Sequence, residues 1–376
     1  MLRRDALLAM AAAGLKLAAE EKPVVSSATV SKTPPVRATG PGIPGPFPGR
    51  VVAIHHEGSI VSGAYQAAPV REMMRKGMAE LTGAPSWEDA WRLFFKPGDV
   101  VGIKVNPVGR PHVISAPAVL HEIVEGLKAA GVRTPDIFVY DRYRNEFLEA
   151  GYDKWLPDGV RWSWATYQSG GGQLDMEGYD RDHYVELPLV HSEFNPAEAR
   201  VRRSFFAKFL TQTVNKLVNL AVLKTHQSAG VTLALKNLSH GLVNNTRRSH
   251  STGTMNACGV FIPAVVDQPI IREKAVLQIV DGIRGLYRGG PVIPAPDYVW
   301  ENKTIYFATD PVALDRTAWQ AIDAYRADRR LPPIAISKPP TDGIYLNCQP
   351  EYIEIAGALG LGEFDTGKIT VKRSDI

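Results

Sequence analysis

The stretch Leu217-Val218-Asn219-Leu220-Ala221-Val222-Leu223 is largely apolar, and Lys224-Thr225-His226 follows it directly. A short apolar run predicts a buried β-strand, so the three polar residues should emerge together at its carboxyl end. Open α/β sheets place their ligand sites at that edge. After a short turn that contains glycine, the chain continues as Val231-Thr232-Leu233-Ala234-Leu235-Lys236-Asn237-Leu238, a predicted helix. The stretch therefore predicts an α/β fold in which two lysines and a histidine converge at one sheet edge.

Strands and helices alternate on both sides of this stretch. The apolar patterns predict strands at 51–55, 99–105, 137–140, 217–223, 276–280, 304–308 and 369–372, and helices at 70–81, 87–95, 118–130, 231–242, 312–325 and 352–359. This alternation predicts an α/β fold with a doubly wound, mainly parallel sheet, built from two coupled α/β halves at about 50–150 and 204–376. The residues between them, 151–203, have no clear period and are expected to form a central irregular insertion. Within it, Tyr184-Val185-Glu186-Leu187 alternates like a strand.

The amino terminus has the layout of a twin-arginine export signal. Arg3 and Arg4 precede a short, alanine-rich apolar segment that ends in small residues at Ala19. This predicts a signal segment at 1–19 and a periplasmic or otherwise exported protein; the alternative is a short amphipathic helix of the fold. The apolar run is too short to span a bilayer as a stable helix, although an uncleaved segment could tether the protein. Residues 20–49 are rich in proline and glycine, which predicts a linker before an α/β domain at 50–376.

Four separated motifs resemble one protein family. They are NLAVLKTH with GVTLALKNL at 219–238, IVDGIRGL at 279–286, ATDPVALD at 308–315 and AGALGLGEFDTGKITV at 356–371. Together they resemble the bacterial and archaeal domain of unknown function numbered 362, over about 100–371. Some members of that family carry ferredoxin-like iron–sulfur segments, so the resemblance implies an iron–sulfur redox partner. This chain has only Cys258 and Cys348, and it cannot hold a four-cysteine cluster alone.

Lys224, His226 and Lys236 are the candidate catalytic residues. On the predicted helix, Thr232, Lys236 and His240 are four residues apart and line one polar stripe. The alternative is that this stripe simply meets solvent. A lysine crowded by other cations has a lowered pKa and can act as a base or form a Schiff base, and His226 could move a proton near neutral pH.

Further polar residues follow the other predicted strands and complete the candidate ligand site. The candidate ligand-binding residues are Lys104, Asn106, Asp141, Asn237, Asp281 and Asp310. A single aspartate after a strand often caps a helix instead, and Asp310 before Pro311 fits that alternative. Buried lysines cost free energy unless they are paired or liganded, so a small anion such as a carboxylate or phosphate is the expected partner.

A metal site is the competing interpretation of these polar residues. His226 with Asp281 or Asp310 could supply nitrogen and oxygen ligands, and His55-His56-Glu57 ends the first predicted strand. No tight ligand spacing occurs, and adjacent histidines point to opposite sides of a strand. The metal and the cofactor are therefore unknown from sequence. Cys258 and Cys348 could form a disulfide after export or remain free.

The composition is ordinary for a globular protein, with 45% hydrophobic and 22% charged residues and a formal net charge of +4. There is no basic stripe with interleaved aromatic residues, so nucleic acid is not an expected partner. Arg200, Arg202 and Arg203 form a local exception, either a solvated loop or a contact for an acidic partner. The first hypothesis is an exported enzyme that binds a small anionic substrate. The alternative is a non-catalytic accessory or binding protein associated with an iron–sulfur redox partner.

Overall fold

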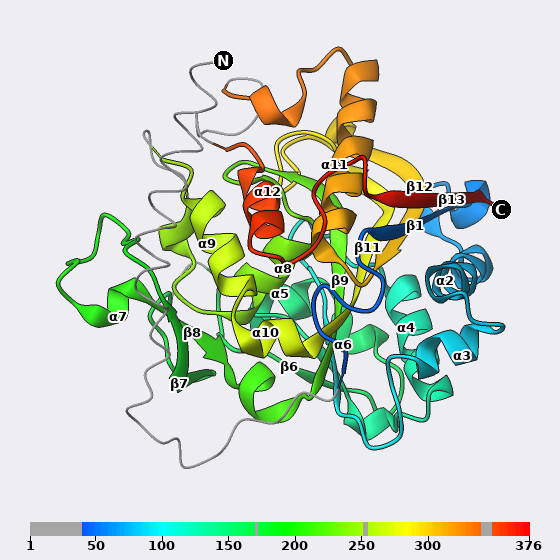
Figure 1. Cartoon of the computed structure of the whole chain (residues 1–376), viewed down its shortest axis with the longest axis horizontal. Helices are drawn as coiled ribbons and strands as arrows, with labels where there is room; N and C mark the ends of the chain where they lie inside the picture. Colours follow the sequence, from blue (N-terminus) through cyan, green and yellow to red (C-terminus); the bar gives the residue numbers. More distant parts are fainter. Residues whose placement is uncertain (1–39, 170–171, 251–254, 340–347) are drawn as a thin grey trace.

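The computed structural model describes residues 40–169, 172–250, 255–339 and 348–376 (Figure 1). Its main sheet has the strand order β13-β1-β12-β11-β9-β4-β5-β6, and β10 pairs with β9. The strands are β1 (Arg50–His55), β4 (Val101–Lys104), β5 (Ile137–Tyr140), β6 (Arg161–Ser163), β9 (Lys216–His226), β10 (Gly230–Val231), β11 (Ala275–Leu286), β12 (Val299–Ala308) and β13 (Thr370–Asp375). Most neighbouring strands are parallel, which confirms the predicted α/β fold with a mainly parallel sheet.

The direction of β12 is the exception within this sheet. It runs antiparallel to both of its neighbours, β11 and β1. The chain turns back from β11 into β12 without a crossover helix, and a direct return of this kind produces an antiparallel pair. The carboxyl end of β12 therefore lies at the opposite edge from the carboxyl ends of β4, β5 and β9.

Two helical layers cover the two faces of the sheet (Figure 1). On one face, α2 (Ala67–Thr82), α3 (Trp87–Arg92) and α4 (Pro117–Ala129) share an apolar core with β4, β9 and β11. On the other face the core includes α8 (Leu233–Leu242), α9 (Ala257–Val266), α11 (Pro311–Asp328) and α12 (Glu351–Ala358). Shorter helices are α5 (Arg144–Glu149), α6 (Tyr152–Trp155), α7 (Ala199–Arg202) and α10 (Pro269–Lys274). Because α8 lies inside its layer, nearly all of its residues are buried.

The two coupled halves share one sheet. Strand β1 belongs to the first half, yet it pairs with β12 and β13 of the second, so both halves build one sheet. The expected insertion also begins later than 151, because Arg161–Ser163 is the edge strand of that sheet. The strand predicted near Tyr184 is confirmed: β7 (Tyr179–Glu186) pairs with β8 (Arg203–Ala207) in a small antiparallel sheet. A further two-stranded sheet joins β2 (Ile60–Val61) and β3 (Ala64–Tyr65).

Residues 40–49 were expected to belong to the linker, but they pack against the domain. The backbone N–H of Ile43 donates to the carbonyl of Arg272, and the N–H of Gly49 donates to Asp310. A Cβ at Gly42 would lie 1.8 Å from the Arg272 carbonyl oxygen, so only glycine fits this approach. The packed body thus begins before Arg50. The expected signal at 1–19 and the linker at 20–39 lie outside the described residues.

No helix in the part of the chain that the structure describes has the length and hydropathy of a membrane-spanning segment.

Candidate functional site

The carboxyl ends of β4, β5 and β9 lie side by side and bring five of the predicted residues together. Lys104 ends β4, and its ammonium donates to Asp141 Oδ1 at 2.7 Å and to Asn237 Oδ1 at 3.2 Å. Lys224, near the end of β9, donates to Asn106 Oδ1 at 2.8 Å and to the carbonyl of Val108. The Asn106 amide donates to Asn237 Oδ1 at 3.1 Å. The two asparagines therefore connect the two lysines in one network.

Helix α8 positions Asn237 and Lys236 against this network. Its amino terminus is held by Asp315 of α11, whose carboxylate accepts the backbone N–H groups of Ala234 and Leu235 at 2.7 and 2.9 Å. Leu233, the first helical residue, has φ of 47°, a left-handed conformation that is strained for a leucine. Asp315 was not among the predicted site residues, although it lies in the ATDPVALD motif.

Glycine at position 241 lets the helix approach Lys104. A Cβ at Gly241 would lie 2.0 Å from Lys104 Cε and 2.8 Å from its Nζ. Any larger residue would displace the lysine from Asp141. The packing of α8 on β4 thus depends on this glycine.

Lys236 lies on the same helix, and the structure decides between the two interpretations of its polar stripe. Thr232 and Lys236 are 4% and 7% exposed, so these two residues do not meet solvent, whereas His240 is partly exposed. The reason is that α8 packs against the sheet and also against α9 and α11. Within the described residues, the ammonium of Lys236 has no hydrogen-bond or ion-pair partner.

Arg142 completes the cluster and was not predicted. It is buried two residues after β5; its Nε donates to the Tyr179 hydroxyl at 3.1 Å and its Nη1 donates to Thr246 Oγ1 at 2.6 Å. Its Nη2 is buried without a hydrogen-bond partner, and among the described residues it has no carboxylate in an ion pair. Its position beside Asp141 at a strand end is the sequence signal that could have identified it.

Burial and mutual repulsion shift the pKa values of two of the lysines. Burial, followed by the charge of Lys236, lowers the pKa of Lys224 to about 7. Burial also lowers the pKa of Lys236 to about 8, and the charges of Arg142 and Lys104 contribute in the same direction. The charges of Glu146 and Asp141 act on Lys224 in the opposite direction, but its pKa is still lowered.

The two histidines near the cluster are held neutral. Burial and then the charge of Lys236 lower the pKa of His226 well below its ordinary range. The N–H of Ser228 donates to His226 Nδ1 at 3.1 Å, so the neutral ring carries its proton on Nε2. Burial lowers the pKa of His240 in the same way, and its two ring nitrogens contact the hydroxyls of Ser239 and Ser249.

Two of the predicted ligand residues do not join the cluster. Asp310 lies at the opposite edge because β12 is antiparallel, so its predicted placement is wrong. Its carboxylate caps α11 through Val312 and Ala313 and also accepts two other backbone N–H groups. Asp281 accepts the backbone N–H groups of Ala116 and Ile283, at 2.9 and 3.2 Å, and holds the start of α4. Burial raises the pKa of Asp281 to about 7.

The described residues do not support the predicted metal site. His226 and Asp310 lie at opposite edges of the sheet, so they cannot bind one ion. Within residues 40–169, 172–250, 255–339 and 348–376, no group of three or more His, Cys, Asp or Glu side chains is placed to hold a metal ion. Cys258 and Cys348 are buried free thiols, and burial raises the pKa of Cys258 to about 11.

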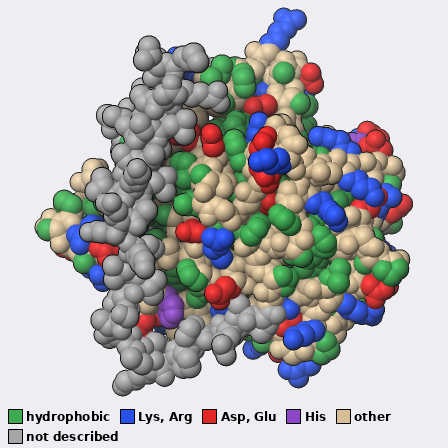
Figure 2. All heavy atoms as spheres, viewed as in Figure 1, with side chains coloured by type: hydrophobic (Ala, Val, Ile, Leu, Met, Phe, Trp, Pro, Cys, Tyr) green, Lys and Arg blue, Asp and Glu red, His purple; other side chains and the backbone are tan. Residues whose placement is uncertain are grey.

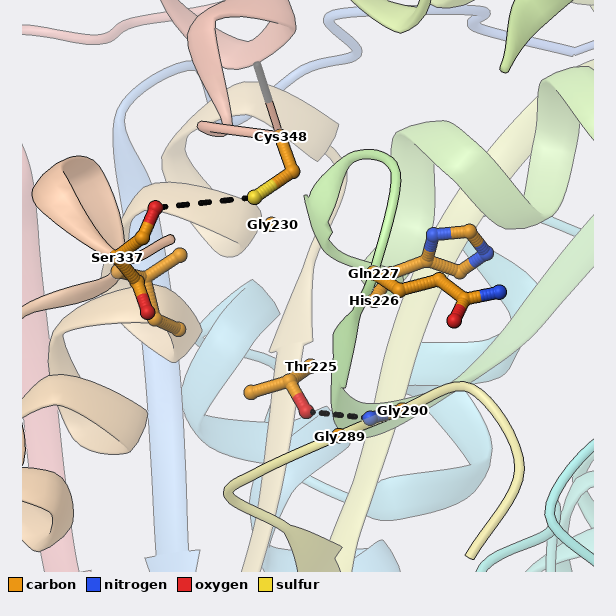
Figure 3. Close-up of a pocket in the computed structure, with 9 residues that line it drawn as sticks. Thr225, His226, Gln227, Gly230, Gly289, Gly290, Ser337 and Cys348 are labelled. Carbon is orange, nitrogen blue, oxygen red and sulfur yellow. Dashed lines mark hydrogen bonds between the residues drawn. The ribbon is translucent and has the colours of Figure 1, made fainter. Parts of the chain in front are cut away.

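A small pocket lies beside the end of β9 (Figure 3). The Gly290 N–H donates to Thr225 Oγ1 at 3.1 Å across it, and the thiol of Cys348 points toward Ser337, whereas the His226 ring extends away from both. Its volume of about 10 Å³ is close to that needed by one water molecule. This pocket is too small for an organic substrate.

The cluster contrasts with the outer surface. On the face shown in Figure 2, lysine and arginine side chains lie among aspartate and glutamate side chains. At the carboxyl edge, by contrast, three lysines and an arginine are buried together with one ion-paired carboxylate. Positive charge is therefore concentrated in the interior at this edge.

Comparisons with known proteins place the chain in a family without assigning it a reaction. No curated protein matches the sequence. Among solved structures, it is similar to the lactate racemase apoprotein from Thermoanaerobacterium thermosaccharolyticum, at 10% identity and a TM-score of 0.38, over 72% of this chain and 57% of that one. It is also similar to a protein from Thermotoga maritima, at 12% identity and a TM-score of 0.39, over 72% of this chain and 61% of that one.

The chain therefore spans about six tenths of the length of each of these two structures. The family model described as a domain of unknown function, DUF362, matches residues 101–320. That match covers more than half of the chain and includes the lysine cluster, so this protein belongs to the DUF362 family.

Proposed function

We propose that this protein is an enzyme that binds a small organic anion at the carboxyl edge of β4, β5 and β9. The observation that carries the proposal is the excess of buried cationic groups. Lys104, Lys224, Lys236 and Arg142 are all at most 7% exposed, and Asp141 is the ion-pair partner of Lys104 alone. Buried charge without a counter-charge costs free energy, and a bound carboxylate or phosphate would remove that cost.

The residues support different roles in such a site. Arg142 offers an unused N–H donor from a rigid planar group, which suits a carboxylate oxygen. Lys224 is a second positive charge, held in place by Asn106. His226 is neutral, so it can accept or donate a proton as general acid or base. Lys236 has no hydrogen-bond or ion-pair partner among the described residues, and it is the candidate nucleophile.

Anion binding is tested by calorimetry and native mass spectrometry on the purified protein, with a panel of small carboxylates and phosphates. We expect binding by the wild type and a loss of at least tenfold in affinity for Arg142→Met and Lys224→Met. Lys154→Met serves as the control, because Lys154 is exposed. Equal affinities in all four proteins, with folding intact, would contradict the proposal. If Lys236→Ala still converts a substrate of the wild type, Lys236 is not the nucleophile, and the role of the site would be restricted to binding.

We also propose that residues 1–19 direct export through the twin-arginine pathway. The support is the pair Arg3 and Arg4 before a short apolar segment. Replacement of both arginines by lysine should retain the protein in the cytoplasm, as measured by cell fractionation. Unchanged export of that variant would exclude this pathway.

A further inference from the structure

The three lysines of the cluster differ in their partners. Lys104 donates to Asp141 and Asn237, and Lys224 donates to Asn106 and a backbone carbonyl. Lys236 is also buried, but no acceptor among the described residues fixes its ammonium. These acceptors hold the nitrogens of Lys104 and Lys224 in place. Among the three lysines, Lys236 is the one whose nitrogen can turn toward a bound molecule and react as an amine.

The neighbours of Lys236 favour a reaction with an anionic molecule. Asn237, the neighbour of Lys236 on α8, accepts a hydrogen bond from Lys104, and Lys104 pairs with Asp141, the neighbour of Arg142, so this network brings the two segments together. Arg142 keeps one buried N–H donor without a partner. His226 pairs with Gly230 of β10, the strand that leads directly into α8, so the neutral imidazole lies at the same end of β9. An amine, a carboxylate-binding donor and a proton carrier thus share one site.

The amine of Lys236 is also chemically competent near neutral pH. With a pKa of about 8, about a tenth of Lys236 is unprotonated at pH 7, against a negligible fraction for an ordinary exposed lysine. The neutral amine is the form that attacks a carbonyl carbon.

From this arrangement we propose that Lys236 forms an imine with the carbonyl carbon of a 2-oxo acid whose carboxylate pairs with Arg142. This inference rests on the proposed anion-binding function and names its substrate class. The lone pair of Lys236 Nζ attacks the carbonyl carbon, and the former carbonyl oxygen takes up the proton that the nitrogen loses. The resulting carbinolamine expels water to give the imine. Amine and carbonyl are exchanged for imine and water, so the step needs no oxidant or reductant. His226 is the group that carries the proton between nitrogen and oxygen.

Borohydride trapping tests this inference on the full chain. The protein is incubated with glyoxylate or with pyruvate, sodium borohydride is added, and the mass of the intact protein and of its peptides is measured. We expect one reduced adduct per chain, located on Lys236, and none in Lys236→Met. Arg142→Met should reduce the yield with the 2-oxo acids by at least tenfold. Propanal, which has a carbonyl but no carboxylate, should label the wild type and Arg142→Met equally and weakly.

Lys274 provides an internal control. Burial lowers its pKa to about 8 as well, but its ammonium donates to the carbonyls of Leu210 and Val214. If Lys274 is labelled as strongly as Lys236, the adduct follows the pKa alone and the inference is overturned.

Thermal unfolding with the same 2-oxo acids separates the inference from the proposed function on which it rests. Absence of an adduct, with the wild type still stabilised by glyoxylate or pyruvate and Arg142→Met not stabilised, overturns the imine and retains the anion site. Absence of both adduct and stabilisation overturns the imine and argues against the anion site.

Discussion

Replacement of Lys236 by methionine is expected to make the protein more stable at neutral pH. The pKa of Lys236 falls from an ordinary 10.5 to about 8, and each pKa unit corresponds to about 1.4 kcal/mol. The buried ammonium therefore costs the folded state about 3 kcal/mol. Methionine has a similar length and no charge, and the substitution breaks no hydrogen bond among the described residues. We expect the free energy of unfolding to rise by about 1–3 kcal/mol, while anion binding is lost.

The pH dependence of this gain follows from the lowered pKa. Below pH 8 the lysine is protonated in both the folded and the unfolded state, so the cost of burying its charge is present in full. Between pH 8 and 10.5 the unfolded state binds more protons, and the wild type therefore gains stability relative to the methionine variant. Above pH 10.5 both states are neutral at this position and the cost disappears. The stabilisation by methionine should be largest below pH 8 and should vanish as the pH rises through this window.

Urea denaturation of the wild type, Lys236→Met and Lys154→Met at pH 7 and at pH 10.5 measures both effects. Lys154→Met should match the wild type at both pH values, because Lys154 is exposed. The reasoning is refuted if Lys236→Met is less stable than the wild type at pH 7. It is also refuted if the difference between the two proteins is the same at both pH values.

Three other outcomes are expected. Lys104→Met should lower the free energy of unfolding by about 3–5 kcal/mol, because it leaves the buried carboxylate of Asp141 unpaired; adding Asp141→Asn should recover part of this loss in urea denaturation. Asp310→Ala should cost about 1–2 kcal/mol through loss of the α11 cap, and calorimetry should show unchanged anion affinity, since the residue lies at the other sheet edge. Anion affinity should fall steadily as the pH rises from 7 to 9, because Lys224 and Lys236 lose their protons in that range; an affinity that is independent of pH would mean that neither lysine faces the anion.

The convergence of the lysines could be predicted from sequence because it depends on local patterns. An apolar run that ends in a polar residue indicates the end of a buried strand, and parallel strands end at the same edge. Lys104, Asp141 and Lys224 come together for this reason. Their hydrogen-bond partners Asn106 and Asn237 follow from the same placement, since each lies next to the end of a strand or on the helix that packs over it.

The direction of a strand and the hydrogen-bond partners of its charged side chains could not be predicted in the same way. The pattern at 304–308 indicates a strand but does not indicate which way it runs, and for that reason Asp310 was placed at the wrong edge. Whether a charged group is paired depends on contacts between distant segments. Arg142, for example, is held by Tyr179 and Thr246 and yet keeps an unused donor. Residues 40–49 look like a linker because proline prevents regular structure, but their packing against Arg272 depends on tertiary contacts.

The position of β1 in the sheet has a consequence for synthesis of the chain. Val52 pairs with Phe307 and Val51 with Val371, so the first strand of the sheet has partners that leave the ribosome last. Until they emerge, an apolar strand with unpaired backbone groups remains open to other nascent chains, which favours aggregation. Nonlocal pairing of this kind also slows folding. A chain that stops before β12 would therefore not be a smaller version of the domain, because its first strand would have no neighbour in the sheet.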